Sequence, residues 1–272
     1  YVQDVPVVQP VATECRLFVD GEELTGRDVG EPAERPVIYQ VRPNILQASV
    51  TPPEGLIGPA VYVKDGNIED YPADPRGAIV FMDFDCEKRW RNAFALGARA
   101  VVFIGSESDD PAARPYHHVN LPANLPRFYV PAKVAERLDL TRPKRIRILS
   151  ATRWQSLTGR NIIGVIRGSN PKFADKDDAR AEAVVLAAPL DSYSEVPCLS
   201  PGARGAANCA ALLHIARRLA SRPVGQRQRR DVVVAFLDAQ TQCQLGARAF
   251  YGALYRDDAK KGRAWMSLVG SV

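Results

Sequence analysis

The sequence predicts an α/β protein, with an open mixed sheet flanked by helices that follows a smaller, β-rich domain. Apolar strands alternate with amphipathic helices over residues 150–272, which is the pattern of a sheet covered on both faces. A second strand–helix–strand unit, interrupted by Gly97, lies within residues 77–104. The 272 residues leave room for two domains, and 46% hydrophobic with 25% charged residues is ordinary for a globular protein.

The N-terminal part is expected to be irregular at first and regular afterwards. Over residues 1–58, glycine and proline interrupt short strand-like pieces at 16–19 and 37–41, so irregular β structure is expected. Apolar runs and a helical period then predict strands at 60–64, 77–84, 100–104 and 125–130, and helices at 87–96 and 132–138. We place a first domain at residues 1–150, with its core at about 55–140.

The second half predicts an α/β domain over residues 151–272. Residues 145–149 alternate like a half-buried strand, and residues 184–188 are almost entirely apolar, as in a buried parallel sheet. Apolar residues recur at spacings of three and four over the helix predicted at 206–221. Further strands are expected at 161–166, 231–237 and 264–269, and a further helix at 242–256. Because the chain stops just after a predicted strand, we expect either that it is part of a longer protein or that the ordered region ends there.

The net charge and its distribution limit which classes of partner are expected. The net charge is +5 and the isoelectric point is near 9.0, with the densest basic cluster at Arg222, Arg227, Arg229 and Arg230. No aromatic residue interleaves with these arginines, so stacking on nucleic-acid bases is unsupported and no nucleic-acid partner is predicted. A solvated loop is the favoured interpretation of the cluster, and an anionic surface is the alternative.

Cysteine usage and hydropathy bear on location. The five cysteines show no CxxC spacing, so neither a structural zinc site nor a redox motif is indicated. Cys15 could pair with Cys86, and Cys198 with another cysteine, in an oxidising compartment. No run of 18 apolar residues is present, so no membrane span is predicted within the chain. Because the chain begins at Tyr1, we expect a trimmed N-terminus, an extracytoplasmic location and a signal peptide or anchor upstream.

Five ordered segments of the second half resemble one enzyme family. They are residues 160–169, which end in Gly-Ser; 184–192, which end in Pro-Leu-Asp-Ser; 201–203, Pro-Gly-Ala before a helix; 236–247, with Leu-Gly-Ala; and 265–270. In this order they resemble the co-catalytic zinc exopeptidases, which include aminopeptidases, glutamate carboxypeptidase and the transferrin receptor. The resemblance implies a zinc-exopeptidase-like fold for residues 151–272.

A second resemblance covers residues 55–140. The strand at 77–84 is followed by Cys86 and a helix, and then by Gly-Ala-Arg-Ala-Val-Val-Phe at 97–103. This order is similar to that of protease-associated domains, which commonly accompany the same peptidase family. The resemblance implies a protease-associated domain in the first half of the chain.

The zinc exopeptidase resemblance implies a chemistry that this chain does not carry. The family holds two zinc ions on histidine and carboxylate ligands, and a separate glutamate takes a proton from the attacking water. The departures are Pro189 for the first histidine, Arg204 or Gly205 for the bridging aspartate, Gln240 for the general base, Thr241 for the next glutamate ligand and Ser267 for the aspartate of the last strand. Asp191 alone is retained, and its family role is to orient the missing histidine.

These departures predict a non-catalytic binding or interaction module without zinc. Its partner would be an unknown protein or peptide. The alternative is a zinc-dependent aminopeptidase or other hydrolase with a site rebuilt around Asp191, Asp238 and Gln240. A third possibility is one segment of a larger membrane-anchored assembly.

Other candidate sites are weaker. His117 and His118 lie in a predicted loop at residues 106–124, where a solvated pair is favoured over a metal site. His214, on a predicted helix, is expected to be structural. The cluster of Asp83, Asp85 and Glu87 lacks an EF-hand pattern and is interpreted as a polar loop rather than a calcium site. No Gly-x-Ser-x-Gly elbow surrounds Ser192, Ser194 or Ser200, and residues 202–205 lack the features of a phosphate-binding loop.

Overall fold

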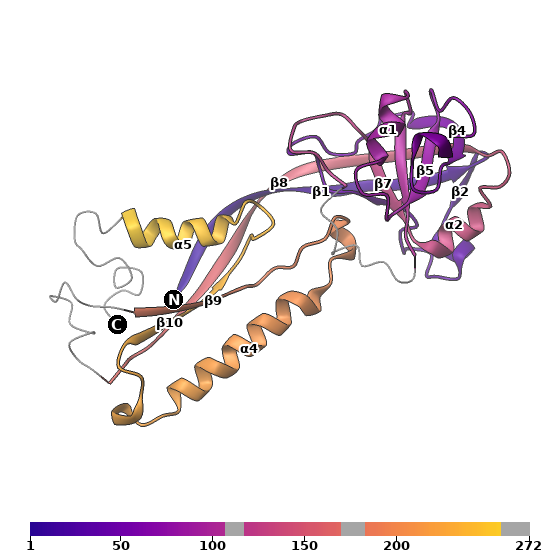
Figure 1. Ribbon diagram of the computed structural model, residues 1–272. Helices are drawn as coiled ribbons and strands as arrows, with labels where there is room; N and C mark the ends of the chain where they lie inside the picture. Colours follow the sequence, from indigo (N-terminus) through magenta and orange to yellow (C-terminus); the bar gives the residue numbers. More distant parts are fainter. Residues whose placement is uncertain (107–116, 170–182, 257–272) are drawn as a thin grey trace. The chain divides into compact units, whose positions relative to one another are not determined.

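The computed structural model describes residues 1–106, 117–169 and 183–256. Ser267 and the strand predicted at 264–269 therefore lie outside the described residues. The chain forms two compact units, coloured along the sequence in Figure 1. The first unit comprises Tyr1–Gln9, Ser156–Tyr193 and Pro201–Val272, and the second comprises Pro10–Gln155 and Ser194–Ser200.

Two long strands, β1 (Val2–Val19) and β8 (Arg145–Ile166), contribute to both units. They run antiparallel: Tyr1 and Ile163 exchange backbone hydrogen bonds at one end, and the Asp20 amide donates to the Arg145 carbonyl at the other. The prediction of irregular structure before residue 16 is therefore wrong, and the strands predicted at 145–149 and 161–166 are one strand. The reason is pairing between residues far apart in the sequence, which local pattern does not reveal.

The second unit is built on the strand order β2-β1-β8-β4-β5-β6-β7-β3. Strands β4 (Leu56–Tyr62), β5 (Ile79–Asp83), β6 (Ala100–Ile104) and β7 (Arg127–Val130) are mutually parallel, whereas β3 (Tyr39–Gln40) and β8 join the two sides antiparallel. The short β2 (Glu22–Leu24) pairs with the end of β1. Helices α1 (Trp90–Ala95) and α2 (Ala132–Leu138) complete the unit.

Alternation along β5 divides the core of the second unit into two layers. Ile79 and Phe81 pack in one buried cluster with Val134 of α2. Val80 and Met82 pack in the other with residues of α1, among them Trp90 and Ala93. The apolar run from Ile79 to Met82 is thus explained by burial on both faces of the sheet.

The predicted solvated histidine pair is wrong for His117. His117 is fully buried, and its ring stacks on Phe84 with centroids 4.2 Å apart. Its Nε2 lies 2.6 Å from the Phe84 carbonyl, and since a carbonyl only accepts, Nε2 donates. His118 Nδ1 lies 3.2 Å from both carboxylate oxygens of the buried Glu195. Residues 117 and 118 are thus held in place by aromatic packing and by these polar contacts.

The first unit is a sheet with the order β8-β10-β9. Strand β10 (Asp231–Leu237) runs antiparallel to β8 and parallel to β9 (Ala183–Pro189). Side chains of β10 alternate: Val232 and Val234 pack toward α4 (Gly202–Ala220), whereas Val233 and Ala235 pack with Phe250 of α5 (Leu245–Arg256).

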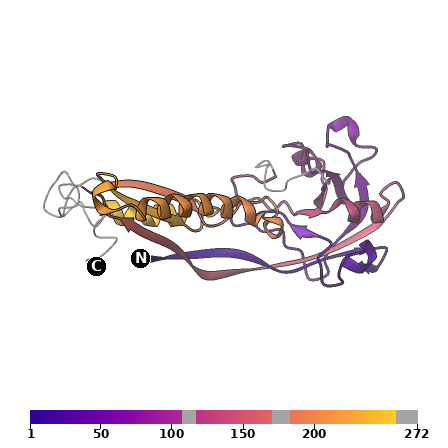
Figure 2. The ribbon, with the colours of Figure 1, turned by 90° about the horizontal axis from the view of Figure 1, so that it is seen from below.

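Helices therefore cover both faces of this sheet, which confirms the predicted α/β class (Figure 1). The second view shows α4 lying along the strands that it covers (Figure 2). Among the described helices, none has the length and apolar character needed to cross a lipid bilayer.

Candidate functional site

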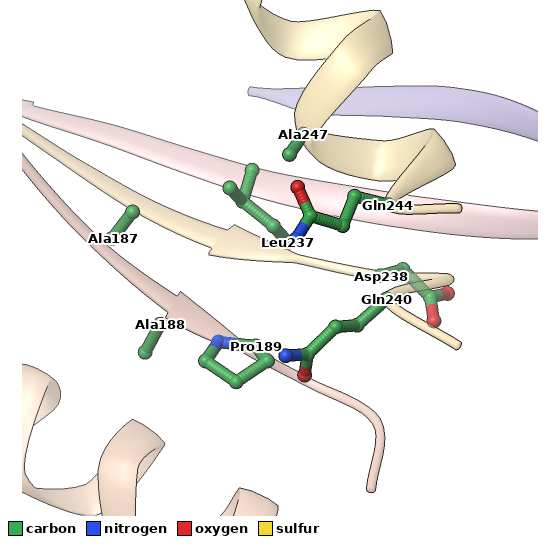
Figure 3. Close-up of a pocket in the computed structure, with 8 residues that line it drawn as sticks. All are labelled: Ala187, Ala188, Pro189, Leu237, Asp238, Gln240, Gln244 and Ala247. Atoms are coloured by element: carbon green, nitrogen blue, oxygen red, sulfur yellow. The ribbon is translucent and has the colours of Figure 1, made fainter. Parts of the chain in front are cut away.

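A cavity of about 140 Å³ opens at the carboxyl ends of β9 and β10, beside the start of α5 (Figure 3). In open α/β sheets, ligands bind outside the carboxyl ends of the strands, so this is the expected place for a functional site. The lining residues are Ala187, Ala188, Pro189, Leu237, Asp238, Gln240, Gln244 and Ala247. Of the positions predicted from the sequence, Pro189, Asp238 and Gln240 thus share one cavity.

Pro189 ends strand β9 and forms part of the cavity wall. The next amide, that of Leu190, donates to the Leu237 carbonyl at 2.8 Å, so the nitrogen of Pro189 faces the outer side of β9, where proline is tolerated. The Pro189 carbonyl accepts a hydrogen bond from the Cys209 thiol at 3.1 Å. Burial raises the pKa of the Cys209 thiol, which favours this protonated donor. Pro189 is held by its backbone and presents only a hydrocarbon ring.

Asp191, the position predicted to be retained from the family, bonds to backbone. Its Oδ1 accepts from the Gln240 amide at 3.0 Å, and its Oδ2 accepts from the Thr241 amide at 3.3 Å. The carboxylate therefore fixes the segment that follows β10 against the segment that follows β9. Asp191 does not line the cavity.

Asp238 lines the cavity, but its carboxylate also bonds to backbone. Oδ2 accepts from the Arg160 amide at 2.8 Å and Oδ1 from the Ala239 amide at 2.7 Å. The Asp238 amide in turn donates to Asn161 Oδ1 at 2.9 Å. In Figure 3 the Gln240 side chain extends toward Pro189, whereas the Asp238 carboxylate is turned away from both. Asp238 thus ties the end of β10 to β8.

The turn between β10 and α5 has an unusual backbone. Ala239, Cys243 and Gln244 have φ values of 54°, 53° and 56°, in the left-handed region that non-glycine residues rarely adopt. Such backbone persists only where the surroundings hold it, and it is frequent at ligand sites. Here the Leu245 amide donates to the Ala239 carbonyl at 3.2 Å, and the Asp191 carboxylate holds the amides of residues 240 and 241.

Close packing explains two glycines near the site. A Cβ on Gly205 would lie 3.0 Å from the Asp191 carbonyl oxygen and 3.2 Å from that of Leu190. A Cβ on Gly246 would lie 2.1 Å from the Asp238 carbonyl oxygen and 2.6 Å from Asn161 Oδ1. Gly205, one of the two positions aligned with the bridging aspartate, therefore has no room for a side chain without displacing backbone.

The donor set does not fit a pair of zinc ions. Proline has no ligand atom, and the amide of Gln240 and the hydroxyl of Thr241 are neutral where the family's chemistry uses carboxylates. Within the described residues, no group of three or more histidine, cysteine, aspartate or glutamate side chains could hold a metal ion. The predicted substitution at Ser267 lies outside the described residues. The other candidates, His117 and His118, belong to the second unit and are not part of this cavity.

Sequence reasoning missed Gln244 as a lining residue. It lies in the turn before α5, and only the left-handed backbone at residues 243 and 244 brings its side chain to the cavity. The sequence carried no signal for this conformation, since neither residue is glycine or asparagine.

A comparison with protein-family models identifies one matching family. Residues 161–268 match the family model described as peptidase family M28. No curated protein matches the sequence. The match confirms the predicted resemblance to zinc exopeptidases.

Solved structures agree in fold. A zinc aminopeptidase from Bacillus subtilis matches with a TM-score of 0.62 and 19% identity, over 96% of this chain and 56% of that one. A peptidase M28 precursor from Shewanella amazonensis gives 0.58 and 17%, over 95% and 58%. An aminopeptidase from Aneurinibacillus sp. strain AM-1 gives 0.51 and 16%, over 96% and 58%. The chain therefore spans less than two thirds of the length of these structures, with which it shares the fold.

Proposed function

Because residues 161–268 match the model of peptidase family M28, we propose that this chain is a non-catalytic member that uses the peptidase scaffold to bind a protein or peptide. The observation that carries the proposal is the environment of Asp191. Both of its carboxylate oxygens accept backbone hydrogen bonds, from Gln240 and Thr241. The one polar group retained from the family's site thus stabilises the loop at the cavity.

The remaining positions support the same proposal. A zinc peptidase needs histidine or carboxylate ligands and a base that takes a proton from water. Pro189 offers neither, and the amide of Gln240 does not accept a proton near neutral pH. We therefore propose that no zinc pair is held here, and we derive no catalytic step.

The cavity suits a small part of a peptide. Its walls are mostly apolar, and the amides of Gln240 and Gln244 add donors and acceptors. Binding sites commonly combine apolar walls with a few polar groups that fix orientation. An apolar side chain flanked by peptide groups would bury its hydrocarbon against Pro189 and Leu237 and hydrogen-bond the two amides.

A hydrolase with a rebuilt site is the second candidate, and Asp238 is the observation that favours it, because it is the one acidic residue that lines the cavity. Its carboxylate accepts from two backbone amides, at 2.8 Å and 2.7 Å. Both carboxylate oxygens are thus engaged by backbone, and the carboxylate is turned away from Pro189 and Gln240 (Figure 3). No second carboxylate lines the cavity among the described residues. The binding module is therefore the better supported function.

Two wider proposals accompany it. The strand, Cys86, helix and Gly97 pattern supports a protease-associated domain in the second unit. An extracytoplasmic setting is the second proposal, and it rests on the resemblance of residues 151–272 to a family that includes secreted aminopeptidases.

The test is an aminopeptidase assay on a panel of aminoacyl p-nitroanilides, with the zinc-supplemented chain and with the chain treated with a chelator. We expect both samples to hydrolyse the substrates at the buffer rate. The matched positive measurement is an NMR titration with apolar tripeptides, in which Gln240 and Gln244 side-chain amides should shift. Zinc-dependent hydrolysis that the chelator abolishes would contradict the proposal.

A further inference from the structure

An arginine-rich surface is formed by residues that lie, in the sequence, between the β9 and the β10 residues of the cavity. Six arginines occur between residues 217 and 230, and no acidic residue interrupts them: Arg217, Arg218, Arg222, Arg227, Arg229 and Arg230. The first acid after them, Asp231, is buried and forms an ion pair with Arg167 at 2.7 Å. We call these six residues with Val224 the arginine end.

The fold gathers these residues at one end of the first unit. They occupy the last turn of α4, the short 3-10 helix Val224–Gln226 and the residues that lead into β10. The Arg227 guanidinium donates from Nε to the Arg222 carbonyl at 2.9 Å and from Nη2 to the Ala220 carbonyl at 3.0 Å. This closes the loop onto the end of α4. Because the cavity follows the carboxyl end of β10, the two features lie at opposite ends of that strand.

Charge balance in the first unit favours an anionic ligand. Its described residues contain four acids: Asp4, Asp191, Asp231 and Asp238. Asp191 and Asp238 bond to backbone at the cavity, Asp4 lies 3.7 Å from Arg160, and Asp231 is buried. In sequence, residues 170–182 carry three basic and four acidic residues, so their net charge offsets only a small part of the arginines.

An apolar side chain projects from the same surface. Val224 is 63% exposed, and it stands in the loop between Arg222 and Arg227. Arg217, Arg218 and Arg222 are themselves exposed. A projecting apolar residue with guanidinium groups on both sides matches the boundary between lipid headgroups and acyl chains.

We propose that the arginine end docks the protein on an anionic lipid surface. Guanidinium groups bind phosphate and carboxylate oxygens in pairs, and each basic residue close to an anionic bilayer strengthens binding by roughly fivefold. A nucleic acid is disfavoured, because residues 217–230 contain no aromatic side chain for base stacking and a polynucleotide offers no apolar phase for Val224. Docking at this end leaves the cavity at the other end of β10 open. The inference does not depend on the proposed function.

The experiment is co-sedimentation of the full chain with phosphatidylcholine vesicles, with and without phosphatidylserine, at low and high salt. We expect binding to the anionic vesicles alone and its loss at high salt, where charges are screened. The triple variant Arg217→Glu/Arg218→Glu/Arg222→Glu should weaken binding by about a hundredfold or more. Val224→Asp should weaken it several-fold with a smaller change in charge.

The matched control is Arg76→Glu/Lys88→Glu/Arg137→Glu, which makes the same charge change on exposed residues of the second unit. It should retain binding within a few-fold, and circular dichroism checks that all variants are folded. Equal binding to neutral vesicles, no binding to anionic vesicles, or an equal loss in the control would overturn the proposal. Tighter binding to RNA than to anionic vesicles of equal phosphate content would also overturn it.

Discussion

At the scale of single residues, Asp191 shows how a carboxylate at a predicted family position can serve a structural role. The resemblance predicts a metal-binding histidine two residues before it, and this chain has Pro189 there. The Asp191 carboxylate accepts the amides of Gln240 and Thr241, which would otherwise lose hydrogen bonds in a half-buried turn. These two hydrogen bonds give the Asp191 carboxylate a structural role in the turn after β10.

Removal of this carboxylate should destabilise the protein. In Asp191→Ala, two backbone amides lose a charged acceptor, and hydrogen bonds to charged groups are worth about 1.5–3 kcal/mol when buried. Since the site is half-exposed, we expect a loss of roughly 1–2 kcal/mol in the free energy of unfolding, measured by urea denaturation. Asp4→Ala, on an exposed residue of the same unit, is the control and should change stability by less than about 0.5 kcal/mol. Equal stability of the two variants would refute the role assigned to Asp191.

At the scale of elements, the turn from β10 into α5 decides the shape of the cavity. Three residues with left-handed backbone and the close approach of Gly246 to the Asp238 carbonyl hold α5 against the end of the strand. The side chain of Gln244 and the methyl of Ala247 line the cavity as a result.

Two glycines of α5 test this account as a matched pair. Gly246→Ala places a Cβ 2.1 Å from the Asp238 carbonyl oxygen, so the helix must shift, and we expect a loss of roughly 2–4 kcal/mol. Gly252→Ala meets no atom within 4 Å and should gain up to about 1 kcal/mol from helix propensity. Thermal unfolding of both variants is the measurement. A Gly246→Ala protein as stable as the parent would mean that this close approach is absent.

Elements with a local signal could be predicted from the sequence, and the others could not. Strand β10 and helix α2 occur at the predicted residues, because an apolar run or a helical period marks each. Most of β1, residues 2–15, was missed, because its prolines suggested irregular structure. These residues are ordered by pairing with β8, and a partner so distant in the sequence cannot be recognised from the local pattern.

The candidate site could likewise be predicted only in part from the sequence. Pro189, Asp191 and Gln240 could be found from sequence because motifs surround them, and all three lie at the carboxyl ends of β9 and β10. Their contacts could not be found, since the backbone bonds of Asp191 and Asp238 depend on a turn with left-handed residues. Three of the positions singled out in the sequence, Pro189, Asp238 and Gln240, line one cavity, and the structure shows that the carboxylates of Asp191 and Asp238 are held by backbone.

At the scale of the whole molecule, alkaline pH should weaken the fold through buried thiols. Burial raises the pKa of Cys86 from 9.0 to about 12, and the pKa of Cys15 by the same amount. A folded thiol with a raised pKa keeps its proton where the unfolded chain releases it, so stability is fully present below pH 9.0 and is lost as pH rises toward about 12. Urea denaturation at increasing pH should show this decline.

Cys86→Ala is the variant that separates the thiol from other alkaline effects. It should be less stable than the parent at neutral pH, because a buried group is lost, but its stability should fall less steeply above pH 9.0. Cys243→Ala, at an exposed thiol, should keep the slope of the parent. An identical slope in all three proteins would contradict the assignment.

The match of residues 161–268 to the peptidase M28 model, the shared fold and the side chains at the cavity support the proposal that this chain keeps the scaffold without a zinc pair. The direct measurement is the zinc content of the tag-free chain, equilibrated with zinc, dialysed and analysed by mass spectrometry, beside a zinc-binding M28 aminopeptidase treated identically. We predict a zinc-to-chain ratio near zero. A ratio of about one or two, as co-catalytic sites hold, would contradict the account.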